Sequence, residues 1–195
     1  MTDLRVDSTR VVLPLFHTVD GGSIPTSTLQ ASDLLFEVCP VKEATRLNRR
    51  WHSRLPQVHD IFWQYAFRGS IQNVIYVVAL WSQPTTRCLP NHWLELRRLA
   101  CAPDAPKNTA SRMLGWMTRH FKSICPERER CISYQDTTAH RGTIYKAAGW
   151  TQAYTGKAMR RDRTTFKRTE NSLYRANING ADVDQSAKIR WEKSL

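Results

Sequence analysis

An uninterrupted apolar segment, Val74–Trp81 (VIYVVALW), restricts the folds open to this chain more than any other part of the sequence. The segment has the length of a strand and is too short to cross a bilayer as a helix. A strand without alternating polar residues is typical of the centre of a sheet, where both faces are covered. We therefore expect 73–82 to be a central strand with other elements packed on both of its sides.

The segments around this strand alternate between strand and helix patterns. Apolar residues from Ala110 to Ile124 recur at helical spacing, and Asn108 or Thr109 is placed to cap the helix start. Gly149 is a typical stop for a shorter helix. A meander followed by strand, helix, strand, helix and strand predicts an α/β (α+β) fold, with a mixed central sheet and helices on both faces. The expected strands are 34–41, 62–68, 73–82, 93–101, 131–135 and 150–154, and the expected helices are 42–51, 110–124 and 139–148.

The length of 195 residues allows one hydrophobic core and is too short for two ordinary domains. Residues 1–31 are predicted to form an irregular arm, because they contain the turn-forming cluster DGGSIPTS at 20–27. The predicted strands and helices fall within 32–156. Basic residues dominate 157–195, which we expect to be an extension with little regular structure.

The charge balance of the chain is strongly positive. Lysine and arginine number 29 against 17 aspartates and glutamates, which gives a formal net charge of +12. Such an excess attracts polyanions through a long-range field that salt screens. DNA, RNA, an anionic membrane and the phosphates of CoA all satisfy this condition, so charge alone does not choose between them.

The cysteine pattern and the N-terminus bear on the cellular compartment. Five cysteines, an odd number without a Cys-x-x-Cys pair, argue against a disulfide framework and a thiolate zinc site, so we expect reduced, mostly buried thiols. No apolar segment is long enough to span a membrane, and the first residues lack the apolar block of a signal peptide. The expected location is the cytoplasm, without a membrane partner.

A first candidate site is the turn 106–112 (PKNTASR), which follows a strand and opens the long helix. Free backbone amides and the helix dipole favour an anion at such a position. The side chains add donors and positive charge suited to a pyrophosphate. An ordinary capped helix start with solvated charges is the alternative, and it is the commoner case. The candidate cofactor-binding residues are Lys107, Asn108, Thr109, Ser111 and Arg112.

A second candidate site is 133–150, where a strand end, a polar loop and a short helix follow one another. Active sites favour the carboxyl edge of strands in such sheets. Tyr145 is placed to donate a proton to a leaving thiolate. Asp136 or His140 is placed to act as a base or to hold the base in position. The alternative assigns Asp136 to a cap, His140 to solvent and Tyr145 to packing. We expect the two candidate sites to open into a single cleft with a positive rim.

The strand, turn and helix at 93–122 and the later segment 133–150 resemble the acyl-CoA-binding half of the GNAT N-acyltransferases. The resemblance implies that the turn 106–112 binds the pyrophosphate of CoA and that Tyr145 protonates the CoA sulfur. The turn is usually rich in glycine in that family, whereas this one contains none. Close approach of the backbone to a phosphate is harder without glycine.

A similar glycine-poor turn is found in the Mom family of phage DNA-modifying proteins, which this chain resembles. Mom-like chains pair a Glu-Leu-x-Arg strand with a turn bearing Ser-Arg, then Ser-Tyr-x-Asp, and then a Gly-x-Ile-Tyr-x-x-x-Gly-Trp helix. The resemblance covers about residues 45–155, within a GNAT-like catalytic domain at 32–156. The matching positions are Glu95, Leu96, Arg98, Ser111, Arg112, Ser133, Tyr134, Asp136, Gly142, Ile144, Tyr145, Gly149 and Trp150, with Trp51 and His52 upstream.

The resemblance implies a transferase that adds a methylcarbamoyl group, an acyl-type group, to the N6 amine of adenine in DNA and so protects phage or mobile-element DNA from restriction. It implies a small-molecule donor, acetyl-CoA or another acyl donor, and a catalytic set of Tyr145, Asp136, His52 and Ser133. It also implies iron, because His52, Asp136 and Tyr145 match the ligand set proposed for the family, and such a set suits iron better than zinc. Ser53 stands where Mom-like chains often have tyrosine.

A protein that modifies adenine in DNA has to flip the base out of the duplex or act on single strands. Trp63 or Tyr65 is a candidate for stacking on the base. Two other functions stay open: a conventional acetyl-CoA-dependent N-acetyltransferase, and a non-catalytic DNA-binding protein with a degenerate GNAT fold. The candidate DNA-binding residues are Arg97, Arg98, Arg141, Arg160, Arg161 and Arg163, with a solvated basic surface as the alternative for each.

Overall fold

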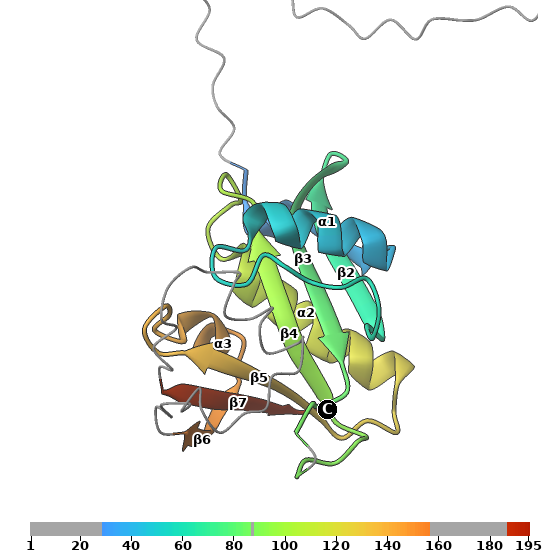
Figure 1. Cartoon of the computed structure of the whole chain (residues 1–195). Coiled ribbons are helices and arrows are strands. Elements are labelled where there is room, and N and C mark those ends of the chain that lie inside the picture. The colour runs from blue at the N-terminus through green and yellow to red at the C-terminus, as the bar shows by residue number, and fades with distance from the viewer. Residues whose placement is uncertain (1–28, 87, 157–186) are drawn as a thin grey trace, which may run out of the picture.

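The computed structural model describes residues 29–86, 88–156 and 187–195. Within these residues the chain forms one seven-stranded sheet and three α-helices (Figure 1). The predicted arm at 1–31 lies outside the described residues except for 29–31. The strands are β1 (Leu35–Val38), β2 (Tyr65–Ile71), β3 (Val74–Ser82), β4 (Leu94–Cys101), β5 (Arg130–Asp136), β6 (Thr151–Gly156) and β7 (Lys188–Ser194), and the helices are α1 (Val41–Trp51), α2 (Thr109–Ile124) and α3 (Thr143–Ala147).

The sheet is mixed, which confirms the prediction. Its strand order is β1-β2-β3-β4-β5-β7-β6. Of the strand pairs described, β4 and β5 run parallel and the others run antiparallel. The apolar strand β3 lies between β2 and β4 inside the sheet, as its sequence predicted.

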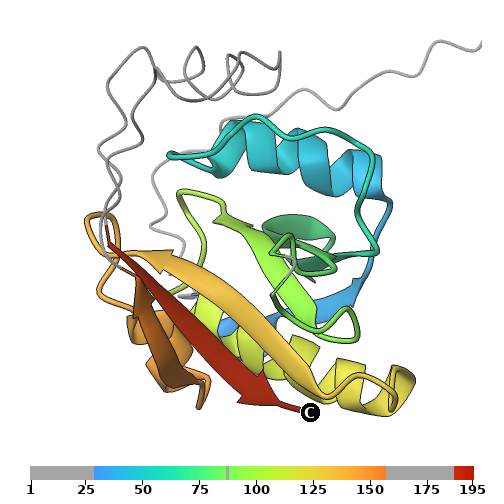
Figure 2. The ribbon, with the colours of Figure 1, turned by 60° about the horizontal axis from the view of Figure 1, so that its bottom comes forward.

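Helices cover both faces of the sheet (Figure 2). Successive side chains of β3 point to opposite faces. Val77, Ala79 and Trp81 pack in the cluster that contains α2, whereas Val78 and Leu80 pack in the cluster that contains α1. From Tyr76 to Trp81 both faces of β3 are buried, which explains why this part of the strand has no polar alternation. We call the two sides the α1 face and the α2 face; α3 packs against α2 and belongs to the α2 face.

Helix α2 is amphipathic in the predicted way. Met113, Leu114, Met117 and Phe121 are fully buried against the sheet. Burial of each such side chain stabilises the fold by about 2 kcal/mol. The indole N–H of Trp81 also donates to the sulfur of Met117 at 3.0 Å. The helix is therefore held firmly on the sheet, and this fixes the position of the turn at its N-terminus.

Helix α3 is shorter than the predicted helix at 139–148, because the residues before it form a loop. The carbonyl of Asp136 accepts two amides of that loop, and α3 begins only after Gly142, whose φ is +72°. The end of α3 agrees with the prediction. Gly149 has φ +71°, and the amide of Trp150 donates to the carbonyl of Tyr145 at 2.9 Å, as in a Schellman motif.

The C-terminal residues differ from the prediction. An extension with little regular structure is wrong for Lys188–Ser194, which form β7 and lie between β5 and β6. The strand was not predicted because its charged residues obscure the alternation of apolar residues. Trp191 is buried on the α2 face, whereas Glu192 is buried on the α1 face with Arg130 and Arg190 as partners. A charged strand is tolerated inside a sheet when its charges are paired.

All five cysteines are free, and Cys39, Cys125 and Cys131 are buried, in agreement with the expected thiols. None of the helices in the described part of the chain is both long and apolar enough to span a membrane. Residues 157–186 lie outside the described residues, and the predicted DNA-binding residues Arg160, Arg161 and Arg163 are among them.

Candidate active site

Strands β4 and β5 start side by side and separate towards their carboxyl ends (Figure 1). They pair only over 94–96 of β4 and 131–133 of β5. Beyond these residues β4 continues to Cys101 and β5 continues to Asp136. The carboxyl edge of the parallel pair is therefore open, and this is the edge at which ligands bind in sheets of this kind.

A β-bulge in β4 accompanies the separation. Trp81 of β3 pairs with Leu96, and Leu80 pairs with Arg98, so Arg97 has no counterpart in β3. A bulge of this type bends its strand and increases the local twist. It therefore turns the second half of β4 away from β5.

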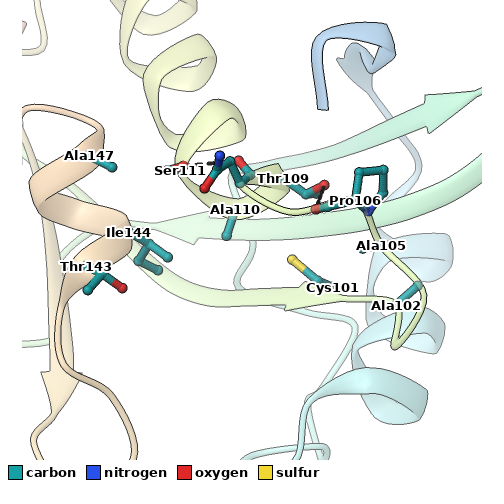
Figure 3. A pocket seen from close by; sticks show the side chains of 11 residues that line it. Cys101, Ala102, Ala105, Pro106, Thr109, Ala110, Ser111, Thr143, Ile144 and Ala147 are labelled. Carbon is teal, nitrogen blue, oxygen red and sulfur yellow. Dashed lines mark hydrogen bonds between the residues drawn. The ribbon is translucent and has the colours of Figure 1, made fainter. Parts of the chain in front are cut away.

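A cleft of about 310 Å³ lies on the α2 face beside the end of β4 (Figure 3). This volume is at the lower end of the usual range for small-molecule sites. The side chain of Ile144 points from α3 towards Ala110 and Cys101 on the other side of the cleft. The lining is mostly apolar and includes Cys101, Ala105, Pro106, Ala110, Ile144 and Ala147.

A second, basic pocket of about 650 Å³ adjoins this cleft and shares Asn108 and Ser111 with it. Lys107, Arg112 and Arg119 line the second pocket. Lys107 and Arg112 are exposed, so their charges are available to a ligand. The two spaces together accommodate a long molecule with an apolar part and an anionic part.

The turn 106–112 joins the two pockets, and its backbone explains how it forms without glycine. Asn108 has φ +71°, a left-handed conformation that asparagine adopts more readily than most residues. Its side chain makes no capping hydrogen bond. The hydroxyls of Thr109 and Ser111 donate to the carbonyls of Pro106 and Asn108 at 2.7 and 3.0 Å.

Because of these bonds, the hydroxyl protons of Thr109 and Ser111 are not available to bind a cofactor. Two hydroxyl protons stabilise the turn itself, and Thr109 is buried. Helix geometry leaves the amides of Ala110 and Ser111 without an intrahelical acceptor. The groups best placed to meet an anion are therefore these two amides and the side chains of Lys107 and Arg112.

Tyr145 lies on the α2 face beneath the point where β4 and β5 separate. Its hydroxyl donates to Oγ of Ser133 at 2.9 Å, and the Ser133 hydroxyl donates to the carbonyl of Leu96 at 3.2 Å. Burial raises the pKa of Tyr145, and the hydrogen bond to Ser133 offsets only part of this effect. The phenol therefore stays protonated at neutral pH.

Two residues that the sequence analysis did not single out hold this region in place. The ring of Trp191 stacks on the ring of Tyr145 with centroids 5.3 Å apart. Its indole N–H donates to Gln135 Oε1 at 2.7 Å, and Gln135 Nε2 donates to the carbonyl of His140 at 2.5 Å. The signal that could have identified Trp191 is the apolar alternation of Ile189 and Trp191 within a charged segment.

Asp136 lies on the opposite face of β5 from Ser133, because positions three apart on a strand point to different faces. Its Oδ2 accepts from Arg54 at 3.0 Å and from Lys188 at 2.7 Å. Its Oδ1 accepts from the amide and hydroxyl of Thr138 at 3.0 and 2.6 Å. The carboxylate therefore orders the loop that follows β5 on the α1 face.

His52 follows the last residue of α1. Its Nδ1 accepts from the amides of Arg54 and Leu55 at 3.3 and 3.2 Å, which places the ring proton on Nε2. Burial, followed by the charges of Arg98 and His140, lowers the pKa of His52 to about 4. The ring is neutral at pH 7 and presents a donor on the α1 face.

Each of the predicted iron ligands has hydrogen-bond partners within the chain. Tyr145 lies on the α2 face, bonded to Ser133, whereas Asp136 lies on the α1 face with both oxygens engaged. The Nδ1 lone pair of His52 is used by backbone amides. Across 29–86, 88–156 and 187–195, no three His, Cys, Asp or Glu residues are placed to hold a metal ion. The predicted set contains a tyrosine and is not of that kind, so iron at His52, Asp136 and Tyr145 stays a prediction, and no step below depends on a metal.

The three predicted DNA-binding arginines that the structure describes have different surroundings. Arg97 lies over the ring of Trp63, with its guanidinium carbon 5.8 Å from the ring centroid. Arg98 lies near His52 on the α1 face, and Arg141 is exposed in the loop before α3. Tyr65, a candidate for base stacking, instead packs edge-on against Phe121 in the core.

The fold defines the class of protein to which the chain belongs. The Bacillus subtilis acetyltransferase solved in complex with CoA superimposes with a TM-score of 0.55 at 10% identity, over 83% of this chain and 99% of that one. Spermidine N-acetyltransferase from Vibrio cholerae, solved with CoA and spermine, gives 0.54 at 10% identity, over 84% and 96%. A GNAT-family acetyltransferase from Streptococcus pneumoniae gives 0.53 at 11%, over 83% and 99%. The chain has the GNAT acyltransferase fold, as predicted.

Within that class the sequence identifies the family. The model of the Mom protein family matches residues 33–194, and the chain belongs to this family. The match extends well beyond the expected 45–155 and includes β7. Among curated protein sequences, none matches this chain.

Proposed function

We propose that this protein is a DNA-modifying transferase of the Mom type. It moves an acyl-type group, methylcarbamoyl in this reading, from a small-molecule donor to the N6 amine of adenine in DNA, and so protects phage or mobile-element DNA from restriction. One observation carries the proposal: the two-part cleft beside the end of β4 is lined by Ile144, the neighbour of Tyr145 in α3, on the same face of the sheet as the Tyr145–Ser133 pair. Membership of the Mom family supports the choice of DNA as acceptor.

The donor that we assign is an acyl-CoA or a molecule of the same build. Its phosphates would meet Lys107, Arg112 and the first amides of α2, where the helix dipole also favours negative charge. Its pantetheine-like arm would follow the apolar cleft between Ile144 and Cys101. Two of the superimposed acetyltransferases were solved with CoA, which supports this assignment.

The acceptor would approach from the α1 face, because the donor cleft occupies the α2 face. His52, Arg54 and Arg98 lie on that side, and His140 is exposed in the loop after β5. In this proposal the two substrates meet where β4 and β5 separate. The target adenine has to leave the base stack to reach it.

In the transfer step the adenine nitrogen attacks the donor carbonyl carbon, the bond from that carbon to sulfur breaks, and the thiolate takes up a proton. We assign this proton to Tyr145, since burial keeps the phenol protonated; the thiolate would replace Ser133 as the acceptor of the tyrosine hydroxyl. The proton lost by the amine passes to His140. Asp136 is the weaker candidate for this base, because Arg54 and Lys188 already neutralise its carboxylate.

Nucleoside mass spectrometry of DNA from bacteria that express the protein tests the proposal. We expect a mass increment on deoxyadenosine with the wild-type chain. Tyr145→Phe should reduce the product on the order of 10²-fold, as expected for loss of a general acid. Tyr154→Phe, which changes an exposed tyrosine on β6, is the matched control and should leave the product unchanged. Unmodified deoxyadenosine in cells that contain soluble wild-type protein would contradict the proposal.

A conventional acetyl-CoA-dependent N-acetyltransferase is the second candidate. The left-handed Asn108 favours it, since the turn reaches a phosphate-binding shape without glycine. It predicts acetylated proteins or polyamines in expressing cells and unmodified DNA. The same mass spectrometry, applied to both fractions, separates the two functions.

A further inference from the structure

Every exposed side chain of α1 is basic. The helix buries Ala44, Thr45, Leu47 and Asn48 against the sheet, and its exposed positions are Lys42, Arg46, Arg49 and Arg50. Residues spaced by three, four, seven and eight positions share one side of a helix, and these four positions have that spacing, counted from Lys42. The four side chains therefore form a continuous stripe about 12 Å long, which we call the α1 stripe.

The stability of the helix does not account for the α1 stripe. Lys42 stands in the first turn, where the helix dipole disfavours positive charge. Lys42 and Arg46, and again Arg46 and Arg50, are like charges four residues apart, and such pairs repel each other. The nearby acids are already engaged: Glu43 with Arg68 and Asp60 with Arg49. The stripe keeps a surplus of positive charge that suits a polyanionic partner.

An exposed apolar tip lies beside the stripe, in the loop between α1 and β2. Ile61 is 60% exposed and Phe62 is 80% exposed. Phe62 also has φ +72°, a backbone conformation that bulky residues rarely adopt. Burial against the described part of the chain therefore explains neither side chain. We call Ile61 and Phe62 the apolar tip.

The loop is fixed to α1 rather than loosely attached. Arg49 donates to the carbonyl of Val58 at 2.8 Å, and the Thr45 hydroxyl donates to Asp60 at 2.6 Å. The indole of Trp63 donates to the carbonyl of His59 at 2.5 Å. Arg49 and Asp60 thus connect the stripe to the apolar tip, which is held in place before any partner binds.

The orientation of α1 connects this surface to the candidate active site. The helix crosses the α1 face, and its C-terminal end lies beside the carboxyl end of β4 (Figures 1 and 2). His52 follows that end and lies near Arg98 and His140. A polyanion that lies along the stripe is therefore led towards the open edge of β4 and β5.

We propose that the α1 stripe and the apolar tip form a surface for duplex DNA. The stripe binds phosphates of one strand, and Phe62, with Ile61, contacts the bases as an apolar wedge of the kind that helps to unstack them. The inference rests on the proposed function for the choice of DNA, but its test measures binding and not modification. None of these residues was among those predicted to bind DNA.

The first test is the salt dependence of binding of the full chain to a duplex oligonucleotide, followed by fluorescence anisotropy. Each phosphate contact contributes about 0.9 to the slope of log K against log salt. Arg46→Gln with Arg50→Gln should therefore reduce the slope by roughly 2. Lys122→Gln with Lys146→Gln removes the same charge from exposed positions on α2 and α3 and should leave the slope unchanged. An equal loss in both double variants, or none in the first, would overturn the proposal.

The second test separates base contact from charge. Phe62→Ala should weaken binding about tenfold without changing the salt slope, because no phosphate contact is lost. A 2-aminopurine in the duplex should brighten with the wild-type chain and not with Phe62→Ala, and Phe62→Leu should restore part of the effect. Leu35→Ala, at a 73% exposed position on β1, is the control and should bind like wild type.

The outcomes distinguish this inference from the proposed function. DNA binding that depends on the stripe, without modification of deoxyadenosine by the wild type, contradicts only the proposed function. Modification with binding that is independent of the stripe contradicts only this inference. A change in self-association of Phe62→Ala, with unchanged DNA affinity, would make the apolar tip a protein contact and would also overturn it.

Discussion

Two positions near the cleft have backbone conformations that limit which residues fit there. Asn108 and Gly142 both have φ close to +70°. Asparagine tolerates this region, and its presence gives the turn 106–112 the shape that glycine provides elsewhere. At Gly142 a side chain is excluded twice, by the backbone and by Gln135 and Trp191 packed against it.

Gly142→Ala is expected to lower the free energy of unfolding by about 1–3 kcal/mol, the usual cost of a non-glycine residue held in such a conformation. The new Cβ would lie 2.5 Å from Gln135 Oε1 and 2.7 Å from the Trp191 ring. Urea denaturation measures the change. Gly115→Ala in α2, where the nearest atom is 3.5 Å away, is the matched control and should gain about 0.5–1 kcal/mol. Equal stability of the two variants would contradict the account.

His52 makes stability depend on pH in a predictable direction. Its pKa is about 4 in the folded chain and 6.5 when unperturbed, so between these values the unfolded chain binds a proton that the folded chain does not. Stability should therefore fall as the pH is lowered through this window. One pKa unit corresponds to about 1.4 kcal/mol. Because the ring is partly exposed, we expect a smaller loss, about 1–2 kcal/mol in total.

Urea denaturation at pH 7 and pH 4.5 measures this dependence. His52→Asn keeps an acceptor for the amides of Arg54 and Leu55 but cannot titrate. The variant should lose less stability than wild type between the two pH values. An identical pH dependence of both chains would show that other groups cause it.

At the scale of elements, the strength of the local pattern decided what the sequence predicted. β3 is apolar from Val74 to Trp81 and α2 has an apolar stripe, and both were located correctly. β7 alternates too, but Lys188, Arg190, Glu192 and Lys193 surround its one tryptophan. Ion pairs with β5 stabilise β7. Because the partners are far apart in the sequence, the local sequence pattern does not reveal these pairs.

The candidate site was predictable in part for the same reason. The turn 106–112 and Tyr145 were found because each belongs to an element with a clear pattern. The sequence grouped Ser133 with Asp136, whereas the pleat of β5 sends them to opposite faces. The α1 stripe was overlooked because a row of arginines on a helix is also an ordinary solvated surface.

The ion pairs of β7 give a prediction at this scale. Glu192 is 5% exposed and accepts from both Arg130 and Arg190. Glu192→Ala would leave two arginines without this carboxylate and should lower the free energy of unfolding by about 3 kcal/mol. Glu129→Ala is the control, since that carboxylate is 71% exposed, and should cost about 0.5 kcal/mol. Thermal denaturation of both variants checks the difference, and similar values would argue against a role for this buried group.

At the scale of the whole molecule, the sheet separates the proposed donor pocket from the proposed DNA surface. The donor pocket lies on the α2 face with Lys107 and Arg112, and the α1 stripe lies on the other. Charge changes on one face should then leave binding on the other face intact.

CoA at 100 times its Kd should stabilise the wild type by about 2.7 kcal/mol, which raises Tm by about 5–10 °C. Lys107→Gln with Arg112→Gln should abolish this shift and keep the affinity for DNA. Arg46→Gln with Arg50→Gln should do the reverse. Absence of a shift in the wild type with CoA and acetyl-CoA would contradict the donor that we assign.

The position of β7 also determines when the molecule can be completed. β6 precedes β7 in the chain, yet it joins the sheet only through β7, whose residues pair with β5 across a separation of up to 64 positions, as in Arg130 with Ser194. Contacts between such distant residues form late and slowly. During synthesis, α1, α2 and β1–β5 can therefore assemble while Tyr145 still lacks the ring of Trp191 against which it stacks. A nascent chain would carry its basic helix well before the proposed catalytic centre was complete, and a chain released from a ribosome that stalled before β7 would keep the proposed DNA surface without that centre.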